Sequence, residues 1–524
     1  MQARAKGCIA AGHPVTAGAG AEILAAGGNA FDAALAALCA ACVAEPVLAS
    51  LGGGGFCLAH DRRAGRTLLH DFFVHTPLRR CELSGIDFPK IVADFGVATQ
   101  DFHIGMGSVA TPGLVRGIFA IHRAHGSLPM REIVAPAVRA AREGVILTPF
   151  QAWILQTIGA IYRHTPGARA LFTDGSGALL QAGARIENPG LADLLDALAR
   201  EGEALFYDGE VAAAIEAESR TRGGHLTRDD LHQYRVIARE PLHVRYRGAT
   251  LITNPPPSSG GLLIAFGLRL LEALGPFEDP PRSVGAAARI AAVLAATQAA
   301  RGRHGATPAL LDPELVAAES ARIAEELAAI AAAPTCTRGT THISVIDAAG
   351  DAAAITVSNG EGCGYLIPGT GTMLNNMLGE EDINPGGFHR WAPGARMASM
   401  MAPTAILGDP PAGGGEGWMA VLGSGGSKRI RTAILQVLVG LLDHGLSLEE
   451  AVASPRIHLD GEHLNVEAGQ SEAALELLAG LYPRHSLWPE PNMYFGGVHA
   501  VAREADGRLH GVGDPRRAGV CLGA

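Results

Sequence analysis

The sequence predicts a fold that combines α-helices with β-strands, and three observations lead to this prediction. Ala-rich segments at residues 13–45 and 285–333 have the composition of closely packed helices. Between and after them, short apolar runs bounded by turn residues predict strands. The character of the chain also changes after residues 331–339, which predict an exposed linker with breakers at Pro334 and Gly339.

The part before the linker begins with two predicted helices. The first ends at Gly27-Gly28-Asn29, and the second runs from about Ala30 to Val43, where Glu45-Pro46 ends it. From Leu114 to about Asp230 the pattern is mostly helical. The remaining predictions here are strands at 56–60, 67–73, 234–237, 243–246 and 250–253, and a helix from Leu262 after the turn Asn254–Gly261.

The part after the linker begins with a predicted hairpin. Residues 341–347 alternate as a strand, residues 348–351 form the turn, and residues 352–358 return. The segment 359–398 is rich in Gly, Pro and Asn, and loops of this length are usually functional or disordered. A strand at 418–422 then leads through the turn Gly423–Ser427 into a helix at about 428–442.

Composition excludes several classes of function. The 52 acidic and 42 basic residues give a net charge of −10, which argues against nucleic acid as the main partner. No apolar run reaches the roughly 18–20 residues of a membrane span. The N-terminus lacks a secretory signal, so we expect a cytoplasmic protein with no membrane partner and with its eight cysteines reduced. No spacing indicates metal ligands, a dinucleotide loop or a phosphate loop, so we expect no metal and no cofactor.

The most informative segment is Arg338-Gly339-Thr340-Thr341, at the start of the predicted hairpin. Cleavage between Gly339 and Thr340 would give Thr340 a free α-amine beside its own hydroxyl. Such an amine, with a reference pKa of about 8, is a general base suited to neutral pH and would activate the hydroxyl as a nucleophile. Because many strands begin after Gly-Thr, a purely structural interpretation also stands at this point.

The hairpin is predicted to bring further polar groups to Thr340. With the turn centred near residues 349–350, Thr340 would lie opposite about Asn359, and Thr341 opposite about Ser358. Cross-strand neighbours are about 5 Å apart, so the Ser358 hydroxyl and the Asn359 amide would reach the Thr340 amine or its acyl substrate. Solvation of a strand end is the alternative role for these residues.

The pair Gly425-Gly426 is predicted between a strand and the N-terminus of a helix. Free backbone N–H groups point outward at such a position, and glycines leave room for a reacting carbonyl. An oxyanion hole needs this arrangement, and a tight strand-to-helix turn is the structural alternative.

Together these segments resemble the γ-glutamyltransferase (γ-glutamyltranspeptidase) family. The resemblance covers nearly the whole chain, with many motifs in the same order, and is therefore specific. The motifs that carry it are Gly27–Ala33, Gly52–Phe56, Pro112-Gly113, Pro256–Gly261, Thr340–Asp347, Leu374–Asn376, Pro403-Thr404, Gly423–Ser427 and Ser454–Arg456.

The resemblance implies an N-terminal-nucleophile hydrolase of the α+β class, with a four-layer αββα sandwich. One precursor would cleave itself into a large subunit, 1–339, and a small subunit, 340–524, which remain together as a heterodimer. Thr340 would first attack the carbonyl of Gly339. The freed Thr340 would then form an acyl-enzyme with a small γ-glutamyl amide such as glutathione, and pass the acyl group to water or to an acceptor amine.

The resemblance also assigns roles to residues around Thr340. Ser358 would take the place of a supporting threonine, and Gly425 with Gly426 would form the oxyanion hole. Ser399 falls at the first of two adjacent serines that bind substrate in the family. The second of these serines is Met400 in this sequence.

Other positions of the glutamyl pocket also depart from the family pattern. The arginine that binds the α-carboxylate after an Asp-Phe pair is replaced by Phe73, and a glutamine is replaced by Met377. The acidic residue is Glu380 instead of aspartate. At the position of the family's substrate asparagine this sequence has Gly360, and the nearest amide residue is Asn359, one position before it. The basic residues considered as substitutes for the missing arginine are Arg79, Arg80 and Arg396.

Three functions remain open from the sequence. The first is a self-processing amidase or transferase that acts on γ-glutamyl compounds. The second is the same chemistry on another acyl group, as in an acylase-type amidohydrolase, which Phe73, Met377 and Met400 favour. The third is an unprocessed, non-catalytic relative that binds a small molecule. The intact Gly339-Thr340 junction and the pair Gly425-Gly426 argue against it.

Overall fold

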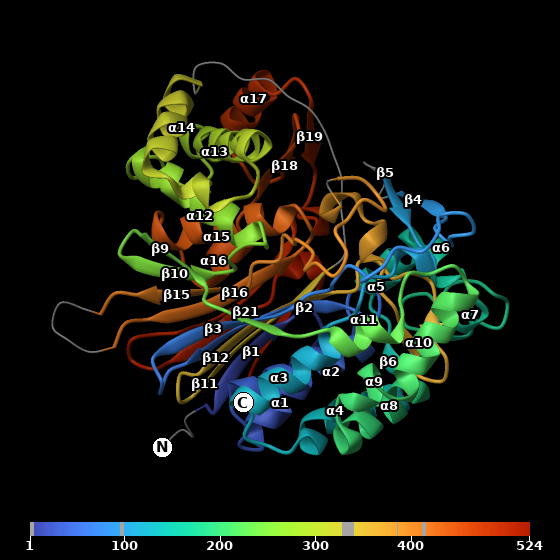
Figure 1. The fold of residues 1–524 in the computed structure, drawn as a ribbon. Helices are drawn as coiled ribbons and strands as arrows, with labels where there is room; N and C mark the ends of the chain where they lie inside the picture. Colours follow the sequence, from blue (N-terminus) through green and yellow to red (C-terminus); the bar gives the residue numbers. More distant parts are fainter. Residues whose placement is uncertain (1–4, 95–98, 327–339, 385, 411–415) are drawn as a thin grey trace.

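Two β-sheets stack face to face, and a layer of helices covers the outer face of each (Figure 1). This computed structural model describes residues 5–94, 99–326, 340–384, 386–410 and 416–524. In Figure 1 the blue and cyan helices of the N-terminal part lie below the sheets, and the yellow and orange helices lie above them. The predicted αββα sandwich is confirmed.

The first sheet has seven strands, with the predicted hairpin at its centre. Ile343 and Val345 face the lower helix layer, whereas Ile346 faces the second sheet. In spatial order its strands are β22 (Val520–Gly523), β1 (Gly7–Ala11), β11 (Thr341–Asp347), β12 (Ala352–Ser358), β2 (Gly54–Asp61), β3 (Arg66–Phe72) and β8 (Ile237–Arg239). Because β1 lies between β11 and β22, the segments before and after the predicted cleavage site share one sheet.

The second sheet has six strands and packs against the central hairpin of the first. In spatial order they are β21 (Leu509–Val512), β20 (Gly497–Arg503), β16 (Met419–Gly425), β15 (Thr404–Gly408), β10 (Ala249–Thr253) and β9 (Leu242–Tyr246). The prediction that β16 ends at 422 is wrong, because the strand continues to Gly425. A Cβ at Gly423 would lie 2.3 Å from the His342 ring, so glycine here lets the two sheets approach closely.

The lower helix layer is built on small residues, as the sequence predicts. Its helices are α1 (Pro14–Ala25), α2 (Ala30–Ala44), α3 (Leu114–His125), α4 (Met130–Glu143) and α8 (Pro189–Glu201). The Asn29 side chain accepts hydrogen bonds from the first backbone N–H groups of α2 and thereby starts that helix. A Cβ at Gly20 would lie 2.3 Å from Ile9 Cδ1 and 3.0 Å from Ala33 O, so glycine lets α1 pack closely on β1 and α2.

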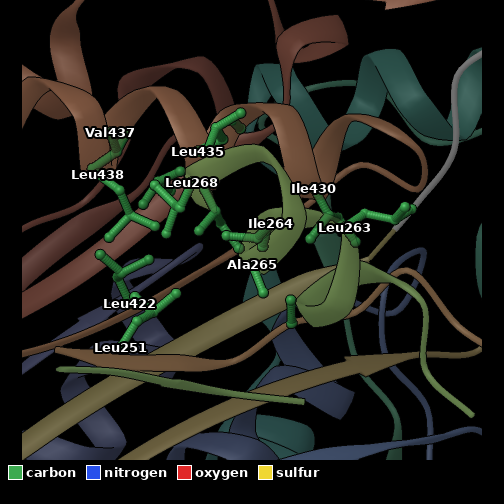
Figure 2. Close-up of a cluster of buried hydrophobic side chains, with 14 of the residues drawn as sticks. Leu251, Leu263, Ile264, Ala265, Leu268, Leu422, Ile430, Leu435, Val437 and Leu438 are labelled. Atoms are coloured by element: carbon green, nitrogen blue, oxygen red, sulfur yellow. The ribbon is translucent and has the colours of Figure 1, made fainter. Parts of the chain in front are cut away.

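The upper layer packs α12 (Gly260–Ala273) and α15 (Arg429–Leu442) onto the second sheet. Figure 2 shows Leu263, Leu268 and Leu435 from these helices above Leu251 and Leu422 of the strands. Burial of each such side chain stabilises the fold by about 1.5–3 kcal/mol. Outside them lie α13 (Val284–His304), α14 (Pro313–Glu326), α16 (Leu448–Ala453), α17 (Glu472–Leu481), and the small sheet β17 (Ile457–Asp460), β18 (His463–Glu467), β19 (His485–Trp488).

Two further predictions of secondary structure are wrong. The single helix predicted at 285–333 is divided into α13 and α14 by a 3-10 turn that begins at Pro308. The strand predicted at 234–237 starts only at Ile237, because Tyr234 ends α11 and its hydroxyl donates to the Phe73 carbonyl at 2.7 Å.

The remaining helices lie together on one side of these layers (Figure 1). They are α5 (Pro149–Thr157), α6 (Gly159–Tyr162), α7 (Pro166–Phe172), α9 (Ala204–Tyr207), α10 (Glu210–Thr221) and α11 (Arg228–Gln233). Short strands accompany them: β4 (Lys90–Asp94), β5 (Thr99–His103), β6 (Val145–Ile146), β7 (Arg185–Ile186), β13 (Leu366–Ile367) and β14 (Thr372–Met373). None of the helices in the described ranges is both long and apolar enough to cross a membrane.

Candidate active site

A small pocket lies where the central hairpin meets the second sheet. Its internal volume of about 30 Å³ has room for roughly two water molecules. It brings together Thr340, Ser358, Glu380, Ser399, Met400 and Phe73 from the predicted site, and also Met377. Four lining residues were not predicted from the sequence: Ile383, Met401, Ser427 and Ile430.

Thr340 is buried at the beginning of β11, 4% exposed. The hairpin pairs Thr341 with Val357, which brings Thr340 level with Ser358. The predicted register is therefore wrong by one residue. The cause is a three-residue turn in which Gly350 adopts φ +89° and its N–H donates to Asp347 O at 3.0 Å. Gly339, the other half of the predicted cleavage site, lies outside the described residues.

The carbonyl group of Thr340 is closely surrounded. Arg517 Nη1 donates a hydrogen bond to Thr340 O at 3.2 Å. A Cβ built on Gly425 would lie 2.0 Å from the same oxygen and 3.0 Å from Arg517 Nη1, so only glycine fits there. Burial lowers the pKa of Arg517 to about 10, and the neighbouring Arg429 adds to this, but the guanidinium stays charged at neutral pH.

The turn after β16 carries the second predicted glycine. Gly426 has φ +118°, a conformation that side chains disfavour, and Ser427 follows at the pocket wall. The Ser427 hydroxyl donates to Asp382 Oδ2 at 2.9 Å, and Lys428 Nζ lies 3.3 Å from Asp382 Oδ1. The loop that carries Glu380 is thereby attached to the glycine turn.

A buried carboxyl lies directly beneath the start of β11. Glu45 accepts a hydrogen bond from Thr341 Oγ1 at 2.6 Å and another from Thr16 Oγ1 at 2.7 Å. Burial raises the pKa of Glu45, and the two hydroxyls lower it again in part. Sequence reasoning treated Glu45 only as part of a helix break and did not identify Arg517, because neither residue lies near Thr340 in sequence.

The motif Pro256–Gly261 holds the serine side of the pocket. Ser258 Oγ and the Ser259 backbone N–H both donate to Ser399 O, at 2.9 and 2.8 Å. Ser259 Oγ also lies 3.3 Å from Met400 Sδ. Loop residues far apart in the sequence are thus fixed as one wall.

Asn359 does not reach the pocket. It is fully buried, and neither polar atom of its side chain has a hydrogen-bond partner in the part of the chain that the structure describes. At Gly360, with φ +68°, a Cβ would lie 2.3 Å from Glu380 Oε1. The Glu380 carboxyl therefore fills the space beside the position where the family pattern has its asparagine.

None of the three predicted arginines supplies a cation to the pocket. Arg396 donates to the Tyr234 hydroxyl at 2.6 Å, and its Nε lies 3.4 Å from Asp71, behind Phe73. Arg80 donates to a backbone carbonyl at 2.5 Å, and Arg79 is exposed. These guanidiniums are bound elsewhere or exposed, and none of the three lines the pocket. Among the described residues that line the pocket, Glu380 is the single charged one.

Two stacked sheets between helix layers, with a threonine at the start of a central strand, define the class of N-terminal-nucleophile hydrolases. Comparison of structures agrees: cephalosporin acylase from Bacillus halodurans superposes with a TM-score of 0.82 at 23% identity, over 99% of this chain and 96% of that chain. This likeness concerns the fold.

The sequence matches the model of the gamma-glutamyltranspeptidase family over residues 16–524. The acylase ACY 1 proenzyme of Pseudomonas sp. (strain V22) is 33% identical over 97% of this chain and 91% of its own. The glutathione hydrolase proenzyme of Escherichia coli (strain K12) is 30% identical over 98% of this chain and 91% of its own. The chain belongs to the γ-glutamyltranspeptidase family of enzymes.

Proposed function

We propose that this chain is a self-processing amidohydrolase that forms an acyl-enzyme on Thr340. Its acyl donor would lack the α-carboxylate that an arginine binds in the family pattern. The observation that carries the proposal is the pocket beside Thr340. Six of its eleven described lining residues are apolar, namely Phe73, Met377, Ile383, Met400, Met401 and Ile430, and Glu380 is the single charged one. An arginine–carboxylate pair would give strong, bidentate recognition, and this pocket offers no partner for one.

In the processing step, the Thr340 hydroxyl attacks the carbonyl carbon of Gly339. The peptide C–N bond breaks, an ester forms on Thr340 Oγ, and water hydrolyses that ester. The products are a new carboxyl at Gly339 and a free α-amine on Thr340. The fragments 1–339 and 340–524 then remain associated, because β1 of the large fragment pairs with β22 of the small fragment in one sheet.

In turnover, the Thr340 α-amine accepts the hydroxyl proton while Oγ attacks the donor's amide carbonyl. The proton passes to the leaving amine, and the acyl-enzyme transfers its acyl group to water or to an acceptor amine. Gly425 and Gly426 would stabilise the oxyanion, and Ser358 would orient Thr340.

A second candidate is hydrolysis or transfer of γ-glutamyl groups, with glutathione as the donor type. Glu380 and Ser399 favour it, because both line the pocket and would hold an α-amino group and a carboxylate oxygen. The glutathione hydrolase relatives also support this candidate.

The processing step is tested by denaturing electrophoresis and N-terminal sequencing. We expect two fragments, with the smaller one beginning Thr-Thr-His, and a single chain of 54.1 kDa for Thr340→Ala. The variant can be neither cleaved nor active, because cleavage and turnover use the same hydroxyl. A small fragment that begins elsewhere would remove the proposal.

The specificity is tested by kcat/KM for a panel of anilides with γ-glutamyl, glutaryl and short acyl groups. We expect the donors without an α-carboxylate to be used better, since the pocket is small and none of its described lining residues is basic. A strong preference for the γ-glutamyl anilide would favour the second candidate instead.

A further inference from the structure

Two thiols from opposite ends of the chain meet in the seven-stranded sheet. Cys8 lies on β1 and Cys521 on the edge strand β22, and their Sγ atoms are 3.3 Å apart. The register pairs Cys8 with Gly523 and Cys521 with Ala10, so the two cysteines are diagonal neighbours. Cys8 is buried and Cys521 is half-buried, which leaves one thiol accessible to a reagent.

The surroundings permit a covalent bond between these thiols. A disulfide needs a sulfur–sulfur distance of about 2.0 Å, so the two Sγ atoms, now 3.3 Å apart, must approach by about 1.3 Å. Gly511 on the neighbouring β21 leaves the room that Cys521 occupies, because a Cβ there would lie 2.9 Å from Cys521 Sγ. Among the cysteines in the described ranges, no other two have their thiols in hydrogen-bond contact.

We propose that Cys8 and Cys521 form a disulfide that links the two fragments of the processed enzyme. Cys8 precedes the Gly339-Thr340 junction and Cys521 follows it, so the bond would join the large fragment to the small one. The disulfide itself depends only on the geometry of β1 and β22. Its role as a link between fragments rests on the proposed cleavage.

The oxidant would be a low-molecular-weight disulfide. The Cys521 thiolate attacks one of its sulfurs and releases one small thiolate. The Cys8 thiolate then attacks Cys521 Sγ in the mixed disulfide and releases the second. Two protein thiols are oxidised and one small disulfide is reduced to two thiols. The hydrogen bond from Cys8 lowers the pKa of Cys521, which favours Cys521 as the first nucleophile.

The experiment treats processed enzyme with glutathione disulfide and compares non-reducing with reducing denaturing gels. We expect one linked species under non-reducing conditions and two fragments after reduction. Peptide mass mapping should identify a Cys8–Cys521 pair, lighter than the two free peptides by two hydrogen atoms. The midpoint of thermal unfolding should rise with protein concentration for the reduced heterodimer and not for the linked one.

Three variants make the experiment specific. Cys8→Ala and Cys521→Ala should each abolish the linked species, and Cys57→Ala, which removes a buried thiol on β2 of the same sheet, should retain it. If both thiols can still be alkylated after oxidation and denaturation, or if the link involves another cysteine, the proposal is overturned. If the chain stays uncut but the peptide map contains the pair, the disulfide stands and the proposed processing fails.

Discussion

Gly425 determines where the Thr340 carbonyl lies, because no side chain separates the two. The hypothetical Cβ at this position would be 2.0 Å from Thr340 O, a distance that no folded structure tolerates without displacement. Arg517 Nη1 contacts the same oxygen at 3.2 Å. These two contacts therefore fix the position of the Thr340 main chain.

We predict that Gly425→Ala reduces kcat by at least about 10²–10³-fold, the range seen when one oxyanion-hole donor is lost. The added methyl group would push Thr340 away from the glycine turn and displace the donor N–H. Steady-state kinetics on the processed fraction measure the effect. Gly480→Ala, on the exposed side of α17 with open space around it, is the control and should retain full activity. Unchanged turnover in soluble, processed Gly425→Ala would place the oxyanion hole elsewhere.

At the scale of elements, the turn Pro515–Arg517 is anchored by a buried ionic network. Asp514 lies 2.6 Å from Arg456 and 3.3 Å from Arg516, and it accepts a hydrogen bond from Val498 N at 2.9 Å. Burial alone would raise the pKa of Asp514, but the two arginines bring it below its ordinary value. This network holds the turn, and with it Arg517, beneath Thr340.

We predict that Asp514→Ala destabilises the fold by about 3–5 kcal/mol, because it leaves buried Arg456 without its anionic partner. Urea unfolding measures the change. The matched control is Asp409→Ala, which removes an exposed carboxylate 2.7 Å from Arg245 and should have little effect, since water solvates both groups. Equal effects of the two variants would show that the buried network does not anchor the turn.

At the scale of the whole molecule, neutral histidines are buried between the sheets. His342 Nδ1 lies 2.7 Å from Thr356 Oγ1, and Ser344 Oγ connects its ring to the His499 carbonyl. Burial lowers the pKa of His342 well below its ordinary value, and burial lowers the pKa of His499 to about 4. Protonation of either ring would place a desolvated charge between the sheets.

We predict that the neutral histidines make their full contribution to the free energy of unfolding above pH 6.5. This contribution decreases as the pH falls toward about 4. In that window His499 binds a proton in the unfolded chain but not in the folded one. The free energy of unfolding therefore decreases by about 3 kcal/mol over the whole window. Urea midpoints at several pH values measure this loss. The urea midpoint of His499→Gln should decrease less steeply with falling pH than that of the wild type. The midpoint of His304→Gln, a change at an exposed position, should decrease as steeply as the wild type. A wild-type midpoint that is constant over this range would contradict the prediction.

The sequence by itself determined the elements whose signals are local. The Asn29 cap and the Ala-rich run placed α2, and the alternation around Gly350 placed the central hairpin, because caps and periodicity act within a few residues. The local motifs identified Thr340 and Ser358 at the pocket and Gly425 beside Thr340. The other predicted lining residues, Phe73, Met377, Glu380, Ser399 and Met400, came from the resemblance to the family.

Only the tertiary structure decided how these elements meet. The one-residue change in register, the binding of Arg396 behind Phe73, and the contacts of Glu45 and Arg517 with the start of β11 were not predictable. The physical reason is that each depends on side chains that packing brings together from distant parts of the chain. A buried charge must be paired with an opposite charge or with hydrogen-bonding groups. Packing therefore decides whether a buried arginine contacts a substrate pocket or a neighbouring carboxylate.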